Sequence, residues 1–126
     1  IVEKNLESEL MVYMIPEQIE QVLINLLENA IKYTPAGGKI KVRVYSAGDK
    51  AVVEVIDNGI GIPAAEQERI FERFYRVDKA RSRALGGTGI GLSIVKHIIE
   101  NHRNKIEVES EEGQGSTFRF YLDRVR

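Results

Sequence analysis

The chain has 126 residues, which is enough to bury a hydrophobic core within one domain. Its 18 basic and 19 acidic residues leave a net charge of −1, so a general electrostatic attraction to nucleic acid or an anionic membrane is excluded. It contains no cysteine and no apolar run of the about 20 residues that span a bilayer, which excludes disulfides, thiolate metal sites and a transmembrane helix. Because Ile1 to Lys4 form neither an initiator methionine nor a signal sequence, we expect residues 1–126 to be a single domain excised from a longer protein.

The first predicted elements are a short strand and a long helix. Leu10 to Met14 has the composition of a strand, and Pro16 suits the first turn of a helix that runs to about Tyr33. The sequence Thr34 to Gly38 then ends that helix, because proline and two glycines cannot continue it.

The middle of the chain predicts a hairpin, a loop and a short helix. Apolar residues alternate in 40–44 and again in 53–57, on either side of a turn at 47–49, which is typical of two antiparallel strands. The glycines of 57–63 predict a loop, and 64–74, rich in Glu and Arg, predicts a short helix.

The last third of the chain predicts a basic loop at 76–87, a second long helix from Gly89 onward, and a closing hairpin of 105–110 with 117–122. This order of elements predicts an α+β fold. We expect a two-layer sandwich, in which about three helices cover one face of a mixed, largely antiparallel sheet.

The first long helix has a polar side in addition to its apolar stripe. At about 3.6 residues per turn, Asn25, Asn29 and Lys32 fall within a narrow arc, with Tyr33 at its edge. The apolar stripe, which can pack on a sheet, is formed by Ile19, Leu23, Leu26, Leu27 and Ala30. The polar side offers amide oxygens, a cation and a ring, a combination that suits a magnesium nucleotide.

A glycine-rich segment, residues 86–92, precedes the second helix. Backbone N–H groups at the start of a helix stabilise a phosphate. The segment is not a Walker loop, because Leu92 and Ser93 follow Gly91 where Lys and Ser/Thr are required, and its spacing does not fit a dinucleotide fingerprint. Alone, it is also compatible with a flexible hinge.

Five motifs occur in one order along the chain. They are Asn25 to Thr34, Asp57-x-Gly59-x-Gly61, Phe71 to Arg76, Gly87 to Leu92, and Gly113-x-Gly115-Ser116-Thr117-Phe118. Together they resemble the motifs of the ATP-binding catalytic domain of bacterial sensor histidine kinases, over nearly the whole chain. The resemblance implies the Bergerat-type ATP-binding sandwich shared with gyrase-type ATPases and heat-shock chaperones. It also implies binding of ATP and Mg²⁺ and donation of the γ-phosphate to a histidine.

The resemblance implies which residues hold the metal and the phosphates. Asn29 resembles the magnesium ligand, and Mg²⁺ accepts an amide oxygen while keeping waters and phosphate oxygens. Asn25 resembles a supporting contact to metal or phosphate, and Lys32 would place its ammonium on the phosphates. Arg76 resembles the arginine that reaches the terminal phosphate. Asn25, Lys32 and Arg76 are thus the expected catalytic residues.

The resemblance also assigns the adenine contacts. Asp57 resembles the residue that accepts a hydrogen bond from the exocyclic amine, although an ordinary turn aspartate is the competing interpretation. Tyr33 would lie against adenine or ribose, and Gly59 and Gly61 would let the backbone approach the base. Further nucleotide contacts are expected from Ile62, Tyr75, Gly87, Thr88, Gly89, Ile90, Gly91, Leu92 and Ser116.

Two of these expectations compete with simple burial. Ser116 shares a strand face with Phe118, so it is either a water-mediated contact near Asp57 or a buried residue. Phe71, Phe74 and Tyr75 resemble the motif that anchors the lid over the nucleotide, and a core role for at least one ring is equally open.

The phosphorylated histidine is expected outside this chain. His97 and His102 lack the sequence context of the acceptor in the family, so we expect both to be structural or surface residues of the second helix. The expected partners are a histidine-bearing dimerisation domain of the same protein and, downstream, a response regulator. We expect a monomeric cytoplasmic domain that does not itself contact the membrane, in a parent protein of the bacterial cell membrane.

Asn25 bears on the choice between phosphotransfer and ATP hydrolysis. Gyrase-type, mismatch-repair and chaperone ATPases carry a glutamate where this chain has Asn25, and an amide cannot activate water, so transfer is favoured over an ATP-driven conformational switch. Glu28 is expected at the surface.

A serine kinase of the anti-sigma-factor type shares the sandwich, and a non-catalytic interaction domain is disfavoured by the intact motifs. Arg103 and Asn104 follow His102 where the family commonly has a pair of glycines, and we expect Asn104 to take the left-handed conformation there.

Overall fold

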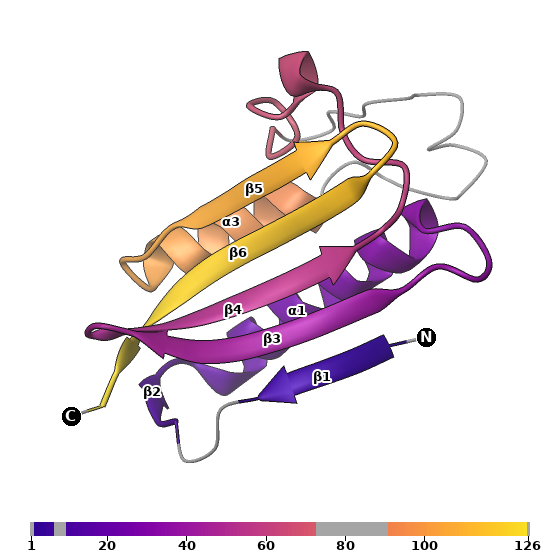
Figure 1. The fold of residues 1–126 in the computed structure, drawn as a ribbon. Coiled ribbons are helices and arrows are strands. Elements are labelled where there is room, and N and C mark those ends of the chain that lie inside the picture. The colour runs from indigo at the N-terminus through magenta and orange to yellow at the C-terminus, as the bar shows by residue number, and fades with distance from the viewer. Residues whose placement is uncertain (1, 7–9, 73–90, 126) are drawn as a thin grey trace.

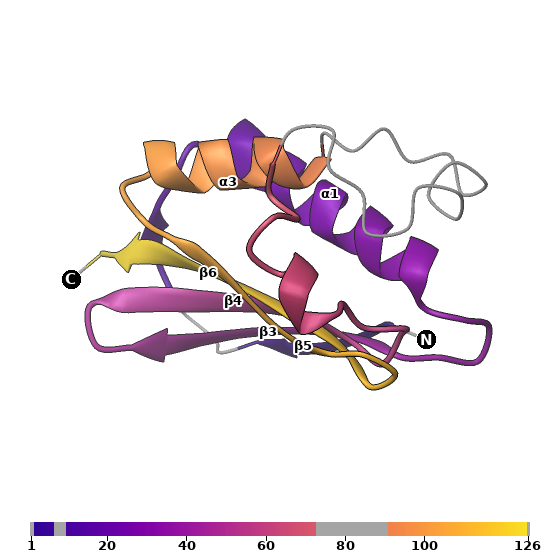
Figure 2. The same cartoon turned by 90° about the horizontal axis from the view of Figure 1, so that it is seen from above.

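The computed structural model describes residues 2–6, 10–72 and 91–125, and Figure 1 labels their elements. In chain order these are β1 (Val2–Leu6), β2 (Val12–Tyr13), α1 (Pro16–Tyr33), β3 (Ile40–Ala47), β4 (Lys50–Asp57), the short 3₁₀ helix η1 (Ala64–Glu66), α3 (Gly91–Asn101), β5 (Ile106–Glu111) and β6 (Gly115–Arg124). Both α-helices lie on one side of the sheet (Figure 2). The predicted two-layer α+β sandwich is therefore confirmed, with two α-helices and η1 within the described ranges.

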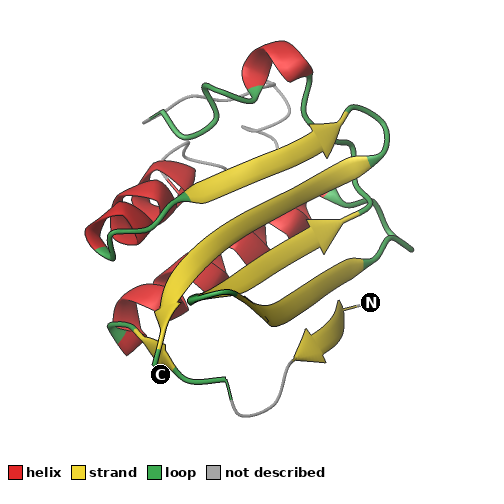
Figure 3. Ribbon diagram, turned by 60° about the vertical axis from the view of Figure 1, so that its left-hand side comes forward, coloured by secondary structure: helices red, strands yellow, loops and turns green. Residues whose placement is uncertain are grey.

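The sheet is mixed and largely antiparallel, as predicted. Its strand order is β1-β3-β4-β6-β2, and β5 also pairs with β6. The pairs β3–β4 and β5–β6 are the two predicted hairpins. β1 was not predicted; it pairs in parallel with β3, so that Val2 lies opposite Ile40. Figure 3 shows these strands in front of the helices.

The hydrophobic core lies between the sheet and the two α-helices. α1 buries Ile19, Val22, Leu26 and Ala30, whereas Leu23 and Leu27 are half-buried at the edge of its apolar stripe. The sheet contributes alternate residues of its helix-facing side, and Phe118 and Phe120 are the largest fully buried side chains. Among the residues that the structure describes, no helix is long and apolar enough to cross a membrane.

The opposite face of the sheet carries a row of charged residues. Arg43, Glu54 and Arg119 lie side by side on β3, β4 and β6 because the strand register places them opposite one another. Glu54 is only 3% exposed, and its two oxygens bind Arg43 Nη1 at 3.1 Å and Arg119 Nε at 2.7 Å. Arg119 also binds the exposed Glu109 at 2.9 Å. A buried carboxylate is thus compensated by two guanidinium groups.

The segment 64–72 differs from the predicted helix over 64–74, whose last two residues lie outside the described ranges. It forms successive i→i+3 bonds, such as Glu66 N–H to Pro63 O and Arg69 N–H to Glu66 O, both at 2.9 Å. Such bonds make a 3₁₀ turn rather than an α-helix. The Gln67 side chain binds Ile62 O and Ser110 O, both at 2.9 Å, and so joins this segment to β5.

The turn after α3 also differs from expectation, since Arg103 and not Asn104 has a left-handed backbone, with φ of 58°. Asn104 N–H donates to Ile99 O at 3.1 Å and Arg103 N–H to Glu100 O at 2.9 Å. This pair of bonds is the Schellman motif, which requires the left-handed residue at position 103.

His102 has the structural role that was expected of it. Its Nε2 accepts a hydrogen bond from Ile15 N–H at 3.0 Å, and its Nδ1 lies 2.8 Å from Ile98 O. Because a carbonyl only accepts and a backbone N–H only donates, these two contacts correspond to the tautomer with its hydrogen on Nδ1. His102 therefore joins the end of α3 to the start of α1. His97 is exposed on α3 and contacts Asn101.

The start of α1 lacks a side-chain cap. Ile15 occupies the N-cap position with φ of −95° and ψ of 107°, and it is 49% exposed. An aspartate with this backbone accepts a hydrogen bond from the first turn and favours the positive end of the helix. We expect Ile15→Asp to raise the free energy of unfolding by about 1 kcal/mol, measured by urea denaturation. Ile15→Ala removes the same apolar side chain without adding a cap, and equal stability of the two variants would contradict the prediction.

Candidate functional site

Two contacts of α1 join residues from three of the motifs predicted to form the site. Asn25 on α1 donates through Nδ2 to Gly91 O at the start of α3, at 3.3 Å, and accepts from Gln21 Nε2 at 3.0 Å. The end of α1 is bonded to the loop after β4, because Ile60 N–H donates to Tyr33 O at 3.1 Å. Three separate motifs of the sequence therefore meet at this end (Figure 1).

Asp57, the last residue of β4, is a buried carboxylate with 8% of its surface exposed. Its Oδ1 accepts a hydrogen bond from Gly59 N–H at 2.9 Å, so the turn interaction that competed with a ligand role is present. Burial raises the pKa of Asp57, and hydrogen bonds from the backbone of Gly59 and Ser116 oppose that rise. Perturbed carboxylates of this kind are concentrated at functional sites.

Gly59 and Gly61 have a local reason to be glycine. A Cβ on Gly59 would collide with the Tyr33 carbonyl, and Gly61 combines φ of 72° with a close approach to the Glu111 carbonyl. The loop after β4 is therefore held between the end of α1 and the β5–β6 turn, where Gly113 N–H donates to Ile60 O at 2.7 Å. The predicted approach of these glycines to a base stays a prediction.

Ser110 of β5, which was not predicted as a site residue, lies opposite Ser116 at this end of the sheet. Ser110 Oγ lies 2.8 Å from Ile62 N, 2.9 Å from Gly115 O and 2.8 Å from Ser116 Oγ. Ser116 itself is 7% exposed, as the burial alternative expected, and it lies opposite Asp57 in register. The signal that could have found Ser110 is its alternation with the apolar residues Ile106 and Val108 on the same face of β5.

The other site residues are either half-buried or outside the described ranges. Asn29, Lys32, Ile62 and Leu92 are half-buried, and Glu28 is exposed as predicted. Phe71 packs edge-on against Phe118 with ring centres 6.2 Å apart, so one ring of its motif has the core role left open above. Outside the described residues lie Phe74, Tyr75, Arg76, Gly87, Thr88, Gly89 and Ile90.

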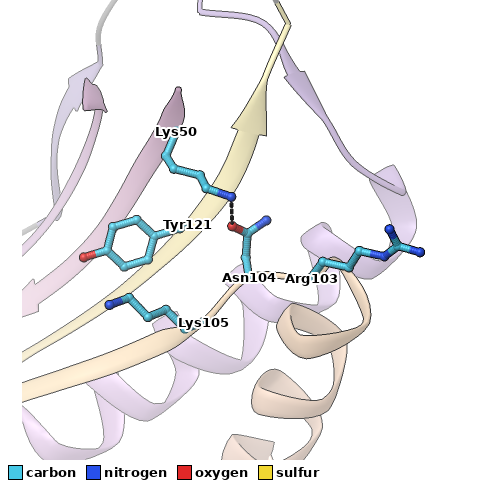
Figure 4. Close-up of a pocket in the computed structure, with 5 residues that line it drawn as sticks. All are labelled: Lys50, Arg103, Asn104, Lys105 and Tyr121. Carbon is cyan, nitrogen blue, oxygen red and sulfur yellow. Dashed lines mark hydrogen bonds between the residues drawn. The ribbon is translucent and has the colours of Figure 1, made fainter. Parts of the chain in front are cut away.

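A cavity of about 410 Å³ lies away from these residues, lined by Lys50, Arg103, Asn104, Lys105 and Tyr121 (Figure 4). Lys50 Nζ donates to Asn104 Oδ1 at 2.8 Å and forms an ion pair with Asp123. Lys105 forms an ion pair with Glu107 at 3.3 Å, and the Arg103 side chain points away from Lys50 and Tyr121. Both lysines of this cavity therefore already have acidic partners.

Comparison of the sequence with known proteins finds a matching family and similar curated proteins. Residues 14–126 match the family described as histidine kinase-, DNA gyrase B-, and HSP90-like ATPase. The signal transduction histidine-protein kinase ArlS of Staphylococcus aureus is 46% identical over 116 residues, which are 92% of this chain and 25% of ArlS. The chain spans only 14% to 25% of the length of the first curated relatives that it matches.

Solved structures agree in fold. The catalytic domain of the histidine kinase ThkA matches with a TM-score of 0.83 at 36% identity, over 99% of this chain and 80% of that chain. Full-length ShkA in complex with AMPPNP matches with a TM-score of 0.81 at 25% identity, over 98% of this chain and 26% of that chain. This chain therefore belongs to the histidine kinase-, DNA gyrase B- and HSP90-like ATPase family, as an ATP-binding catalytic domain of the sensor histidine kinase type.

Proposed function

We propose that this domain binds Mg-ATP and donates the γ-phosphate to a histidine on the dimerisation domain of a sensor histidine kinase. The observation that carries the proposal is the meeting of the polar side of α1, the Asp57 loop and the start of α3 at one end of the sheet. The histidine kinases ArlS and ThkA, to which the chain is similar, support a histidine kinase over a gyrase-type switch or a serine kinase.

Asn25 supports transfer to a histidine rather than hydrolysis. Its amide is held between Gln21 and the Gly91 carbonyl, at the start of α3. An amide cannot take a proton from water, and an imidazole is itself a nucleophile that needs only a correctly placed phosphorus atom. Catalysis by this chain is then mainly positioning and charge stabilisation, to which Lys32 and Arg76 contribute cations.

The residues of the described ranges fit a magnesium ion that is held together with a nucleotide. No group of three or more His, Asp or Glu side chains within those ranges forms a metal cage of its own. Mg²⁺ commonly takes one or two protein oxygens and completes its shell with phosphates and water, so the half-buried Asn29 amide is a suitable ligand. When bound, the ion neutralises charge on the phosphate oxygens.

The phosphotransfer proposal is tested with a separate partner. The chain is mixed with Mg-ATP and the histidine-bearing dimerisation domain of its own parent protein, and acid-labile phosphate on the partner is measured. We expect the partner to be labelled, and no label in the presence of this chain would overturn the proposal. The further partners, a response regulator and a membrane-anchored parent with this domain in the cytoplasm, belong to the same proposal.

The metal role of Asn29 gives a specific prediction. We expect Asn29→Ala to bind ADP nearly equally with and without Mg²⁺, because the amide oxygen that joins the ion to the protein is missing. Titration calorimetry of both proteins, with and without Mg²⁺, measures this. Glu28→Ala is the matched control, since Glu28 is the exposed neighbour on the same helix. A Mg²⁺ dependence that persists in Asn29→Ala would remove Asn29 as the ligand.

A further inference from the structure

Three polar residues form a row across the helix-facing side of the sheet, at the end where the site lies. Asp57 of β4 is opposite Ser116 of β6, and Ser116 is opposite Ser110 of β5. Directly opposed residues have Cβ atoms about 5 Å apart, so the three side chains are neighbours. The next row on this face is apolar and contains Val55, Phe118 and Val108.

The hydrogen bonds of Ser110 determine where its proton points. A hydroxyl has one donor hydrogen and two acceptor lone pairs. Ile62 N–H can only donate to Ser110 Oγ, and the Gly115 carbonyl can only accept from it. The single Ser110 hydrogen is therefore used on Gly115, and the contact of 2.8 Å between the two serine hydroxyls is donated by Ser116.

Ser116 is consequently left as an acceptor. With its hydrogen used on Ser110, the Ser116 hydroxyl keeps only acceptor capacity, and the strand register places Ser116 opposite Asp57. Within the described ranges the Ser116 hydroxyl forms a side-chain hydrogen bond with Ser110 and with no other residue, and Asp57 receives its hydrogen bonds from backbone N–H groups. Two neighbouring acceptors, one of them a carboxylate, suit a ligand group that carries two hydrogens.

We propose that Ser110 is a specificity-determining residue that makes the site select a 6-aminopurine over a 6-oxopurine, by holding the Ser116 hydroxyl as an acceptor next to Asp57. The 6-amino group of adenine can donate one hydrogen to each residue. A 6-oxopurine has an oxygen at that position next to an N1–H donor. It would fit Asp57 with N1–H only if Ser116 donated to O6, which Ser110 prevents. This inference rests on the nucleotide binding proposed above.

The test compares ADP with inosine diphosphate (IDP), which carries the oxygen at position 6, by titration calorimetry on the full 126-residue chain. The unmodified chain should prefer ADP. Ser110→Ala releases the Ser116 hydrogen, which can then reach O6 or Asp57, so the preference should fall by roughly tenfold, the effect of one misdirected hydrogen bond. Ser110→Thr keeps the hydroxyl and should keep the preference.

Two controls separate control of the proton from simple support of the loop. Gln67→Ala removes bonds to Ile62 O and Ser110 O without changing any hydroxyl, so it should weaken ADP and IDP equally. In a Ser116→Ala background, Ser110→Ala should leave the ADP:IDP ratio unchanged, because the group through which it acts is missing. Thermal melts confirm that each variant is folded.

The outcomes distinguish the two proposals. If Ser110→Ala weakens ADP and IDP by the same factor, or still changes their ratio in the Ser116→Ala background, the role of Ser110 in specificity is overturned while nucleotide binding stands. If the unmodified chain binds neither ADP nor IDP, the proposed function itself fails and this inference fails with it.

Discussion

Asp57→Asn is expected to weaken ATP binding by roughly tenfold to a hundredfold, because a hydrogen bond from the adenine amine to a carboxylate is replaced by a weaker one to an amide. Discrimination against GTP should fall with it. Calorimetry with ATP and GTP measures both effects. Asp49→Asn is the matched control, since Asp49 is an exposed turn residue between β3 and β4, and it should change neither value. Undiminished preference for ATP over GTP in Asp57→Asn would contradict the adenine assignment.

The same substitution should alter the pH dependence of stability. Burial raises the pKa of Asp57 in the folded chain above its ordinary value of 3.8. The stabilisation linked to this group is then fully present below pH 3.8 and is lost as the pH rises through the folded-state pKa, because the buried carboxylate ionises. Asparagine does not ionise, and it can keep the bond from Gly59 N–H. We therefore expect the unfolding free energy of Asp57→Asn, measured by urea denaturation, to rise relative to that of the parent as the pH increases from 3.8 to 7.

Arg119→Met is expected to lower the free energy of unfolding by about 2 to 3 kcal/mol. Glu54, whose side chain is 4% exposed, would lose its bond of 2.7 Å and keep only Arg43, whose side chain is 42% exposed. A buried carboxylate that loses a partner costs far more than an exposed ion pair contributes. Urea denaturation of the purified variants provides the measurement.

Two further variants test the cause of that loss. Glu109→Gln removes the exposed partner of Arg119 and should change stability by less than about 0.5 kcal/mol. Glu54→Met combined with Arg119→Met should recover much of the stability, because the uncompensated carboxylate is then absent. If Glu109→Gln and Arg119→Met cost the same, burial of Glu54 is not the reason.

Elements with a strong local pattern were predicted well. The bounds of α1 agree with the prediction because Pro16 and Thr34 to Gly38 carry their own start and stop signals. The two hairpins agree because alternation and tight turns are also local. β1 was missed, since its pairing with β3 joins segments that are far apart in the sequence. Of the helix predicted over 64–74, the described residues form only the 3₁₀ helix Ala64–Glu66 and further i→i+3 turns, and the Gln67 side chain bonds to Ile62 O and Ser110 O there.

The residues of the candidate site were likewise predictable where the signal is local and were missed where it depends on tertiary contacts. Asn25, Asn29 and Lys32 could be grouped on one side of a helix from its period alone, and Asp57 from its place between a strand and glycines. Ser110 and Gln67 could not be found so easily, because their partners are on other elements. The resemblance to histidine kinases assigned roles to residues, but the reasons for Gly59 and Gly61 proved to include close backbone packing within the protein.

By itself, the amino-acid sequence determined the family, the α+β class and the chemical types of group available for a nucleotide, since periodicity and motif order are properties of the linear chain. Only the tertiary structure decided that Arg103 takes the left-handed turn, that Glu54 is enclosed by two arginines, and that the Ser110 hydroxyl lies 2.8 Å from that of Ser116. The physical reason is that hydrogen bonds and burial depend on strand register, and register brings together residues whose separation in the sequence carries no such information.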